Sequence, residues 1–303
     1  MGFWSHATMT RSLTWLLALT LTVSPFAAPT VQAKSPTKPQ VNNHIQRASH
    51  IQSAHIRAGR KHAPKRNMLG NATPDHISFQ SGGKTIRVEL FRAADDTGGR
   101  KPAVMMLHGA GGIGGGLMIY PQAKALAAHG ISAFVVSYYD GLSEKASKAS
   151  AALFEKRDRV IEDALGFIAA QDYVNPDAIG VFGISLGGFH GISLASRDWR
   201  VAALVNVFGA VPQTVSPTLT HMPPTLVMHG DKDRIVPIAH SRALDARLNS
   251  LGVPHELVVY KGEGHCFNGS ALADSIERTV NFFDEHLAVR DGDSAEFETI
   301  AQP

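Results

Sequence analysis

Three side chains that can act together in acyl transfer stand in separate parts of the chain: Ser185, Asp233 and His265. A serine hydroxyl attacks a carbonyl carbon once a histidine takes its proton. A carboxylate holds that histidine in the required tautomer and stabilises the imidazolium that forms. The residue types therefore predict nucleophilic catalysis by Ser185, with His265 as the base and Asp233 as its orienting acid.

The surroundings of Ser185 fit this role. The serine lies in the pattern Gly183-x-Ser185-x-Gly187, which follows an apolar run and precedes a helical stretch. Such a pattern is typical of a sharp strand-to-helix turn that exposes the serine, with glycines where side chains would collide. The backbone N–H of Leu186 then begins a helix, where it is free to bind an oxyanion. Taken alone, the pattern fits an ordinary glycine-rich loop equally well.

A second glycine-rich loop can complete the oxyanion site. Residues 108–112 follow an apolar run, and we expect Ala110, with Gly111 next, to supply a second N–H donor. One such donor stabilises a transition state by about 3–4 kcal/mol. Gly109, Gly111, Tyr139 and Phe267 are predicted to contact the substrate.

Two carboxylates compete for the role of orienting acid. Asp231 and Asp233 lie in the same loop after one predicted strand, so their position along the chain does not separate them. Asp231 immediately follows Gly230 and can cap its own turn. Asp233 lies two residues further on, where the loop can face the segment that carries His265.

These loops need a scaffold that brings strand ends together. Alternating patterns on both sides of Ser81-Gly82-Gly83 predict a β-hairpin. The later apolar runs predict strands buried on both faces of a mostly parallel sheet, with helices between them. The predicted strands are 76–80, 85–91, 103–107, 132–137, 178–182, 201–207, 225–229 and 256–260. The predicted helices are 117–129, 149–171, 186–196, 239–250 and 274–287. Ligands bind at the carboxyl ends of such strands, where all three catalytic candidates fall.

Four motifs in order give the chain a family resemblance over residues 100–287. They are His108-Gly109, Gly183-Ile184-Ser185-Leu186-Gly187-Gly188, His229-Gly230-Asp231-Lys232-Asp233 with Val236-Pro237, and Gly264-His265-Cys266-Phe267. The chain resembles the dienelactone hydrolase family, which belongs to the α/β-hydrolases. In α/β-hydrolases the catalytic residues follow the chain order Ser, Asp, His. The resemblance implies the α/β-hydrolase fold, and it assigns Asp233 as the acid because it stands three residues before Val236. The name-giving enzymes carry a cysteine nucleophile, so Ser185 favours a serine esterase over an enzyme for dienelactone.

The sequence thus predicts a carboxylic ester hydrolase that takes a small-molecule ester or acyl substrate and needs no cofactor or metal. A peptidase or acyltransferase with the same three residues remains open. A binding protein without catalysis is a further class, and the presence of Ser185, Asp233 and His265 together argues against it. A different class is suggested by Gly109 to Gly114, which match G-x-G-x-x-G and precede Asp140 at the next strand end. That pattern is typical of an NAD-dependent oxidoreductase, but it leaves Ser185, Asp233 and His265 unexplained.

The N-terminal part differs in composition from the rest. Arg11, the apolar residues 13–23 and the small residues at 31 and 33 are typical of a signal peptide over residues 1–33. The apolar run is too short to span a membrane, so no stable insertion is expected after cleavage. We therefore expect export to the periplasm or the extracellular space. Residues 34–70 have eight Lys and Arg and no acid, which predicts a disordered linker. Its charge and repeated histidines could give weak contact with an anionic surface or a metal.

The charge distribution and the cysteine content exclude further classes of function and of structural bonds. Nine of the 29 Lys and Arg residues lie in residues 1–70, and none of the 26 Asp and Glu residues does, so the remainder has a net charge of −6. The basic character belongs to the N-terminal segment, and we expect no nucleic acid binding by the domain. The single cysteine, Cys266, excludes an intramolecular disulfide. The predicted organisation is completed by a hydrolase domain over 71–288 and a tail over 289–303.

Overall fold

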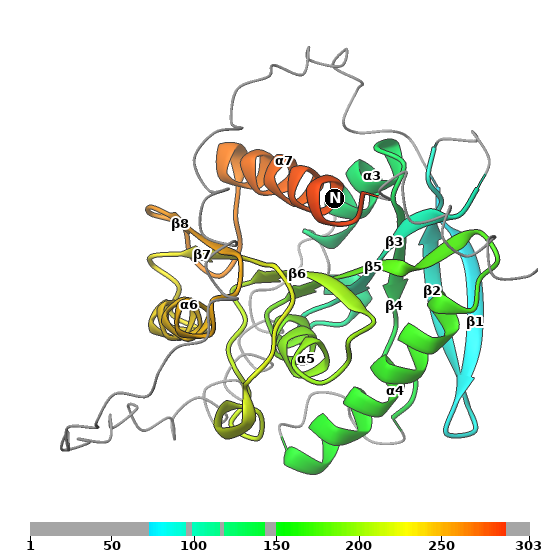
Figure 1. The fold of residues 1–303 in the computed structure, drawn as a ribbon, viewed down its shortest axis with the longest axis horizontal. Helices are drawn as coiled ribbons and strands as arrows, with labels where there is room; N and C mark the ends of the chain where they lie inside the picture. The colour runs from blue at the N-terminus through cyan, green and yellow to red at the C-terminus, as the bar shows by residue number, and fades with distance from the viewer. Residues whose placement is uncertain (1–72, 95–98, 116–117, 143–149, 289–303) are drawn as a thin grey trace, which may run out of the picture. The chain divides into compact units, whose positions relative to one another are not determined.

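A computed structural model describes residues 73–94, 99–115, 118–142 and 150–288. The predicted signal peptide, basic linker and C-terminal tail lie outside the described residues. The described residues form one eight-stranded sheet in the order β1-β2-β4-β3-β5-β6-β7-β8 (Figure 1). Both pairs that involve β2 are antiparallel, and every later pair is parallel. This is the mostly parallel sheet with an antiparallel start that the sequence predicts.

The elements follow the predicted order. The strands are β1 (Asp75–Ser81), β2 (Lys84–Phe91), β3 (Lys101–Leu107), β4 (Ser132–Val136), β5 (Val174–Ile184), β6 (Val201–Val207), β7 (Thr225–Gly230) and β8 (His255–Tyr260). The helices are α3 (Ile119–Ala128), α4 (Ala151–Ala169), α5 (Leu186–Ala195), α6 (Ala239–Leu251) and α7 (Gly269–His286), with short 3-10 turns η1 (Ile113–Gly115) and η2 (Ser216–Thr218).

Two elements begin at least four residues before their predicted starts. Strand β5 begins at Val174, which pairs with Lys101 of β3 although Pro176 follows. Helix α7 begins at Gly269, five residues before the predicted start, because Asn268 takes the extended conformation of an N-cap. Leu272 in its first turn packs against the core, so tertiary contacts extend the helix beyond the amphipathic stretch.

Apolar side chains form a core on each face of the sheet. Helices α4, α5 and α6 cover one face, and α3 and α7 cover the other (Figure 1). Continuous apolar runs such as β4, which is buried at every position, supply side chains to both cores. In the described part of the chain, no helix is long and apolar enough to cross a membrane.

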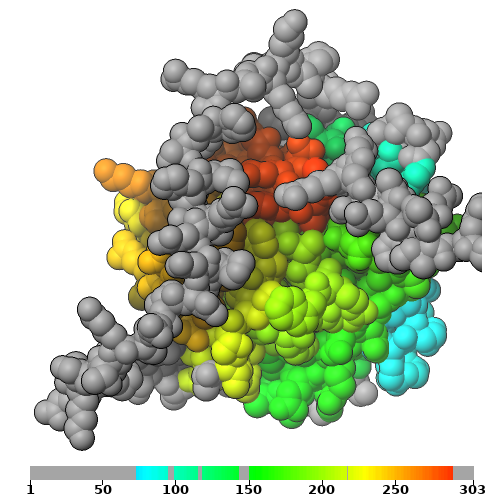
Figure 2. All heavy atoms as spheres, in the orientation of Figure 1, coloured from blue at the N-terminus to red at the C-terminus, as the bar shows by residue number. Residues whose placement is uncertain are grey.

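The sheet ends in two different kinds of edge. The β1–β2 hairpin forms one edge and β8 the other, and Figure 2 shows the hairpin (cyan) and the later segments (orange) on opposite sides of the described part. The central strands β3, β5, β6 and β7 are covered on both faces. Loops at their carboxyl ends therefore start from the most rigid part of the fold.

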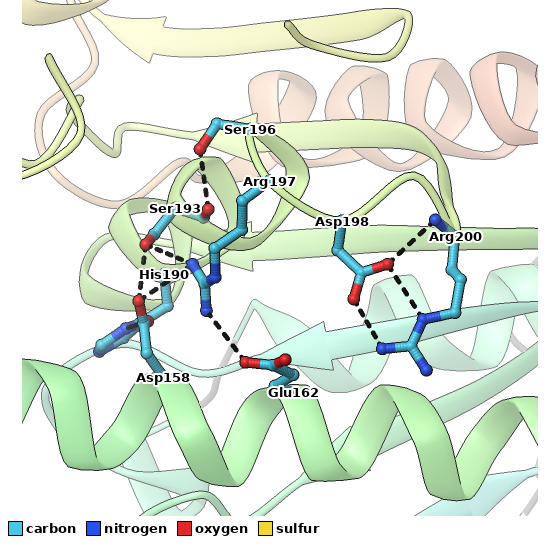
Figure 3. Close-up of polar contacts among 8 residues, drawn as sticks. All are labelled: Asp158, Glu162, His190, Ser193, Ser196, Arg197, Asp198 and Arg200. Carbon is cyan, nitrogen blue, oxygen red and sulfur yellow. Dashed lines mark hydrogen bonds and ion pairs between the residues drawn. The ribbon is translucent and has the colours of Figure 1, made fainter. Parts of the chain in front are cut away.

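A polar cluster fixes α5 to α4, and we call Asp158, His190, Ser193 and Arg197 the α4–α5 clamp (Figure 3). Asp158 on α4 accepts hydrogen bonds from His190 Nδ1 and from Ser193 Oγ, each at 2.6 Å. Arg197, just after α5, contacts Asp158 at 3.2 Å and Ser193 Oγ at 2.7 Å. Because α5 carries the strand-to-helix turn at its first residue, the clamp also supports that turn.

Candidate active site

The turn at Ser185 joins β5 directly to α5. Ser185 has φ 53° and ψ −118°, a conformation that residues with a side chain seldom adopt. A Cβ on Gly183 would overlap the backbone of Gly187, and a Cβ on Gly187 would overlap the carbonyl of Leu107 at the end of β3. The glycines are therefore required by close packing of three backbone segments, as the sequence predicts. The strain is held at one residue, the one that carries the hydroxyl.

Ser185, His265 and Asp233 come together through hydrogen bonds, and we call these three residues the triad. The Ser185 Oγ lies 2.9 Å from His265 Nε2, and His265 Nδ1 lies 2.7 Å from Asp233 Oδ2. A carboxylate only accepts, so the Nδ1 carries a proton and the Nε2 of the neutral ring is free to accept from the serine hydroxyl. Ser185 is 4% exposed and Asp233 is 8% exposed, so both polar groups are largely shielded from water.

The loops after β7 and β8 interlock, which brings Asp233 and His265 together. A Cβ on Gly230 would overlap the carbonyls of Glu263 and Gly264, so only glycine allows this approach. The backbone N–H of Lys232 also donates to the carbonyl of Glu263 at 2.9 Å. The side chains of the two loops meet because their backbones are hydrogen-bonded to each other.

Asp233 is held as a carboxylate by four donors. Its Oδ1 accepts from the N–H groups of Ile235 and Val236 at 2.8 and 3.0 Å, and His229 approaches its Oδ2 to 3.3 Å beside His265. Burial alone would raise the pKa of the Asp233 carboxyl, but the hydrogen bonds from His229 and His265 hold that pKa well below its ordinary value. The group therefore stays ionised at any pH at which the protein works.

Asp231 takes a different position from Asp233. Its Oδ1 accepts a hydrogen bond from the Gly262 N–H at 2.6 Å, and its side chain is exposed. It therefore ties the β7 loop to the turn after β8, rather than capping its own turn. Of these two carboxylates, only Asp233 hydrogen-bonds the imidazole of His265.

Two aromatic rings, one packed on the other, support the imidazole of His265. The Phe208 ring centroid lies 4.5 Å from that of His265, and Phe267 packs edge-on against Phe208 at 5.3 Å. Phe267 is 2% exposed and also contacts Tyr260, so it lies in the supporting core rather than in position to touch a substrate as predicted. Phe208 has φ 41° and, with Ser185, is one of the two non-glycine residues with positive φ in the described part. No feature of the sequence marks Phe208 as part of this site.

The glycine-rich loop after β3 lies against Ser185. A Cβ on Gly109 would be 3.5 Å from the Cβ of Ser185. The Gly112 N–H closes a turn onto the Gly109 carbonyl at 3.1 Å, so the Ala110 N–H in the same peptide unit points away from that bond. Gly111 occupies the other central position of this turn. The loop is placed where a second oxyanion donor is needed.

Tyrosines after β4 position this loop. Tyr139 Oη donates to the carbonyl of Ala110 at 3.1 Å, and Tyr138 Oη donates to the carbonyl of His108 at 2.6 Å. Burial raises the pKa of Tyr139 to about 12, so its hydroxyl remains a donor. The His108 ring stacks on Tyr138 at 4.0 Å, and burial lowers the pKa of His108 to about 4. Tyr139 thus contacts the glycine-rich loop, its contact with a substrate stays a prediction, and His108 is neutral and structural.

The residues expected of a dinucleotide site do not form one. Asp140 pairs with Arg87 of β2 at 2.8 Å and does not face the glycine loop as a ribose ligand would. The loop turns toward Ser185, and Gly114 lies in the short turn η1 before α3. Cys266, next to His265, is exposed. Among the described residues, no group of His, Cys, Asp and Glu is arranged to hold a metal ion.

The sheet order and the serine turn define an α/β-hydrolase. A family model matches residues 88–287, and the chain belongs to the dienelactone hydrolase family. No curated protein matches it by sequence. The class and family predicted from the motifs are therefore confirmed.

Solved structures share this fold at low identity. A puromycin-hydrolyzing peptidase of Mycobacterium tuberculosis is 16% identical with a TM-score of 0.60, and the match covers 75% of this chain but only 41% of that one. A dienelactone hydrolase-like promiscuous phosphotriesterase from metagenomic libraries is 18% identical, with a TM-score of 0.59 and coverage of 72% and 100%. An esterase is 20% identical, with a TM-score of 0.52 and coverage of 64% and 97%. At these identities the likeness shows the fold alone.

Proposed function

We propose that the protein is an exported serine hydrolase that cleaves carboxylic esters through an acyl-enzyme on Ser185. The observation that carries this proposal is the unbroken hydrogen-bond path from Ser185 Oγ through His265 to Asp233 at the strained turn. Family membership supports hydrolysis as the class of reaction. The serine in place of a cysteine favours ester substrates.

In acylation, Ser185 Oγ forms a bond to the ester carbonyl carbon while His265 Nε2 takes the hydroxyl proton. The charge that develops on the carbonyl oxygen is stabilised by the N–H groups of Leu186 and Ala110. The tetrahedral intermediate then collapses, the bond to the alcohol oxygen breaks, and His265 returns the proton to that oxygen. Asp233 stays ionised throughout and stabilises the transient imidazolium.

Deacylation uses the same groups with water as the nucleophile. His265 Nε2 takes a proton from the water while the water oxygen forms a bond to the acyl carbon. Collapse of the second tetrahedral intermediate breaks the bond to Ser185 Oγ, which recovers its proton from His265. The products are one carboxylic acid and one alcohol, and the enzyme is regenerated.

Apolar side chains next to the triad favour an uncharged acyl group. One buried apolar cluster includes Leu186, which follows the nucleophile, and Val236, whose N–H binds Asp233, and Ala110 packs against it. A peptidase or an acyltransferase can use the same triad. A panel of short-chain and long-chain p-nitrophenyl esters, peptide p-nitroanilides and alcohol acceptors separates these three activities.

The decisive test removes the nucleophile. Ser185→Ala should fold normally and lose about 10⁴–10⁶ in kcat for the best ester, because nucleophile and base act as one unit. Wild-type protein should be labelled by a fluorophosphonate with loss of fluoride, and the variant should not. Ser193→Ala is the matched control, because it removes a different buried serine, whose hydroxyl donates to Asp158. Full activity in Ser185→Ala, or NAD-dependent turnover, would show that the proposed chemistry is wrong.

The N-terminal segment supplies the proposal of export. A signal peptide over 1–33 and a basic linker over 34–70 fit the composition, and the linker's charge suits weak contact with an anionic surface. Mature protein should begin near residue 34, and limited proteolysis should trim it to near residue 70 with full activity. N-terminal sequencing and ester assays check both expectations. Loss of activity on trimming would place the linker in the functional unit.

A further inference from the structure

A second histidine contacts the acid of the triad. His229 lies in β7, four residues before Asp233, and its side chain is fully buried. Its Nε2 lies 2.8 Å from the Val236 carbonyl oxygen and 3.3 Å from Asp233 Oδ2. Its Nδ1 lies 2.6 Å from the Oγ of Ser241, a fully buried residue of α6. Both ring nitrogens thus have defined partners.

These partners fix the tautomer of His229. A backbone carbonyl and a carboxylate can only accept, so the Nε2 facing them carries the proton. In the neutral ring, Nδ1 then accepts from the Ser241 hydroxyl. The Nε2–H donates to the Val236 carbonyl and also lies 3.3 Å from Asp233 Oδ2, the oxygen that accepts from His265 Nδ1 at 2.7 Å. Two imidazoles therefore share Asp233 Oδ2.

We propose that His229, oriented by Ser241, is a positioning residue of the reaction centre: it fixes the Asp233 carboxylate and limits how strongly that carboxylate stabilises protonated His265. The proposal rests on the function proposed above. A chain of polar contacts then runs from Ser241 through His229, Asp233 and His265 to Ser185. His229 touches neither the substrate nor the nucleophile, and it acts through Asp233.

Because both imidazoles contact Asp233 Oδ2, we expect His229 to change the electrostatic interaction between Asp233 and His265 as well as its geometry. A carboxylate oxygen that accepts two N–H donors offers less electron density to either one. Without the His229 donor, Oδ2 would bind the His265 imidazolium more strongly. A packing role alone would change the stability of the fold and leave the pH dependence of catalysis unchanged.

Other titratable groups near this pair come from three elements. His240 at the start of α6 has its pKa lowered, chiefly by burial and also by His229. Cys266 follows His265 in the loop after β8 and interacts with Asp233. The charged neighbours of Asp233 in its own loop have exposed side chains: Asp231, Lys232 and Arg234. In the described part of the chain, His265 hydrogen-bonds the carboxylate through its ring at 2.7 Å, and the His229 ring approaches it to 3.3 Å.

The test compares pH profiles of kcat/KM for the wild type, His229→Leu and His229→Gln. His229→Leu should lower kcat by up to about 10-fold with little change in KM, because the acid loses an orienting polar contact. Its acidic limb should move to higher pH, because the carboxylate then stabilises the imidazolium more strongly. His229→Gln should restore most of both values, since its amide can donate from near the position of Nε2.

His190→Leu is the matched control. It removes another fully buried imidazole that hydrogen-bonds an aspartate, but that aspartate is Asp158 of the α4–α5 clamp. It should lower the melting temperature and leave the acidic limb at the wild-type pH. The proposal is overturned if both His229 variants lose stability yet keep the wild-type kcat and acidic limb.

A measurement on the unmodified protein covers the case in which His229→Leu fails to fold. In protein with ¹⁵N-labelled histidine, NMR should show His229 protonated on Nε2 at the working pH. A proton on Nδ1 alone would overturn the proposal. This result does not depend on the substrate, so it stands even if Ser185→Ala retains activity and the proposed function falls.

Discussion

The triad and the α4–α5 clamp both contain a serine, a histidine and an aspartate, and the order in which these residues are connected differs between the two clusters. In the triad, the histidine lies between the serine and the aspartate, so its Nε2 can take the serine proton. In the clamp, the aspartate lies between the histidine and the serine, and the Ser193 hydroxyl donates to the carboxylate itself. The serine of the clamp therefore has no base.

The surroundings separate the two clusters as well. The Nε2 of His190 is buried without a hydrogen-bond partner in the described part, and the Phe154 ring stacks on this imidazole at 4.0 Å. Burial lowers the pKa of His190 although Asp158 opposes this effect. The triad lies instead at the carboxyl ends of the strands, on a strained turn. Catalytic chemistry thus depends on connectivity and access, and the clamp shows what these residues do without them: they hold two helices together.

The largest difference between the clusters should appear when the acid of the triad becomes an amide. Asp233→Asn should keep the shape of the site but favour the wrong tautomer of His265, which costs up to about 10⁴ in kcat. Steady-state kinetics on the best ester measure the loss. Asp158→Asn changes the acid of the clamp in the same way and should retain most of kcat. Equal losses in both variants would mean that the clamp takes part in the chemistry.

How far the sequence predicts this contrast can be judged residue by residue. The turn at Ser185 and the order of strands follow from glycine positions and apolar runs, because backbone packing and burial on both faces restrict those positions strongly. The motif spacing also places Asp233 and His265 at neighbouring strand ends. The local sequence pattern is enough to predict the structure at positions where the backbone geometry allows only one residue type.

Other parts of the site depend on contacts between distant segments. The hydrogen bond from Tyr139 to the Ala110 carbonyl, the packing of Phe208 on His265 and the sharing of Asp233 by His229 join residues far apart in the chain. From the sequence alone, a tyrosine or phenylalanine at a strand end fits equally well in the wall of a pocket or in the core. For this reason the sequence predicts Phe267 at the substrate, whereas its buried ring packs on Phe208 and Tyr260. The start of β5 likewise depends on its pairing with β3.

Substitutions in the α4–α5 clamp should change the stability of the protein, whereas substitutions in the triad should change kcat. Asp158→Asn replaces a carboxylate that accepts from His190, Ser193 and Arg197 and should lower the free energy of unfolding by about 1.5–3 kcal/mol. Urea denaturation measures this change. Asp163→Asn is the control on the same helix, because Asp163 accepts one hydrogen bond, from Ser81. A variant as stable as the wild type would show that the clamp adds no stability to α5.

The smallest expected effect belongs to the carboxylate that the triad does not use. Asp231 accepts from the Gly262 N–H at 2.6 Å on the surface, so Asp231→Asn should lower stability by about 1 kcal/mol and leave kcat at the wild-type value. The exposed position limits the loss because water can replace part of the hydrogen bond. Asp231 and Asp233 are two residues apart in one loop, so kinetics and a melting curve on both Asn variants separate the two roles directly. If Asp231→Asn were the inactive enzyme and Asp233→Asn only less stable, the assignment of the orienting acid would be reversed, and the contact of His265 with Asp233 would have to be structural.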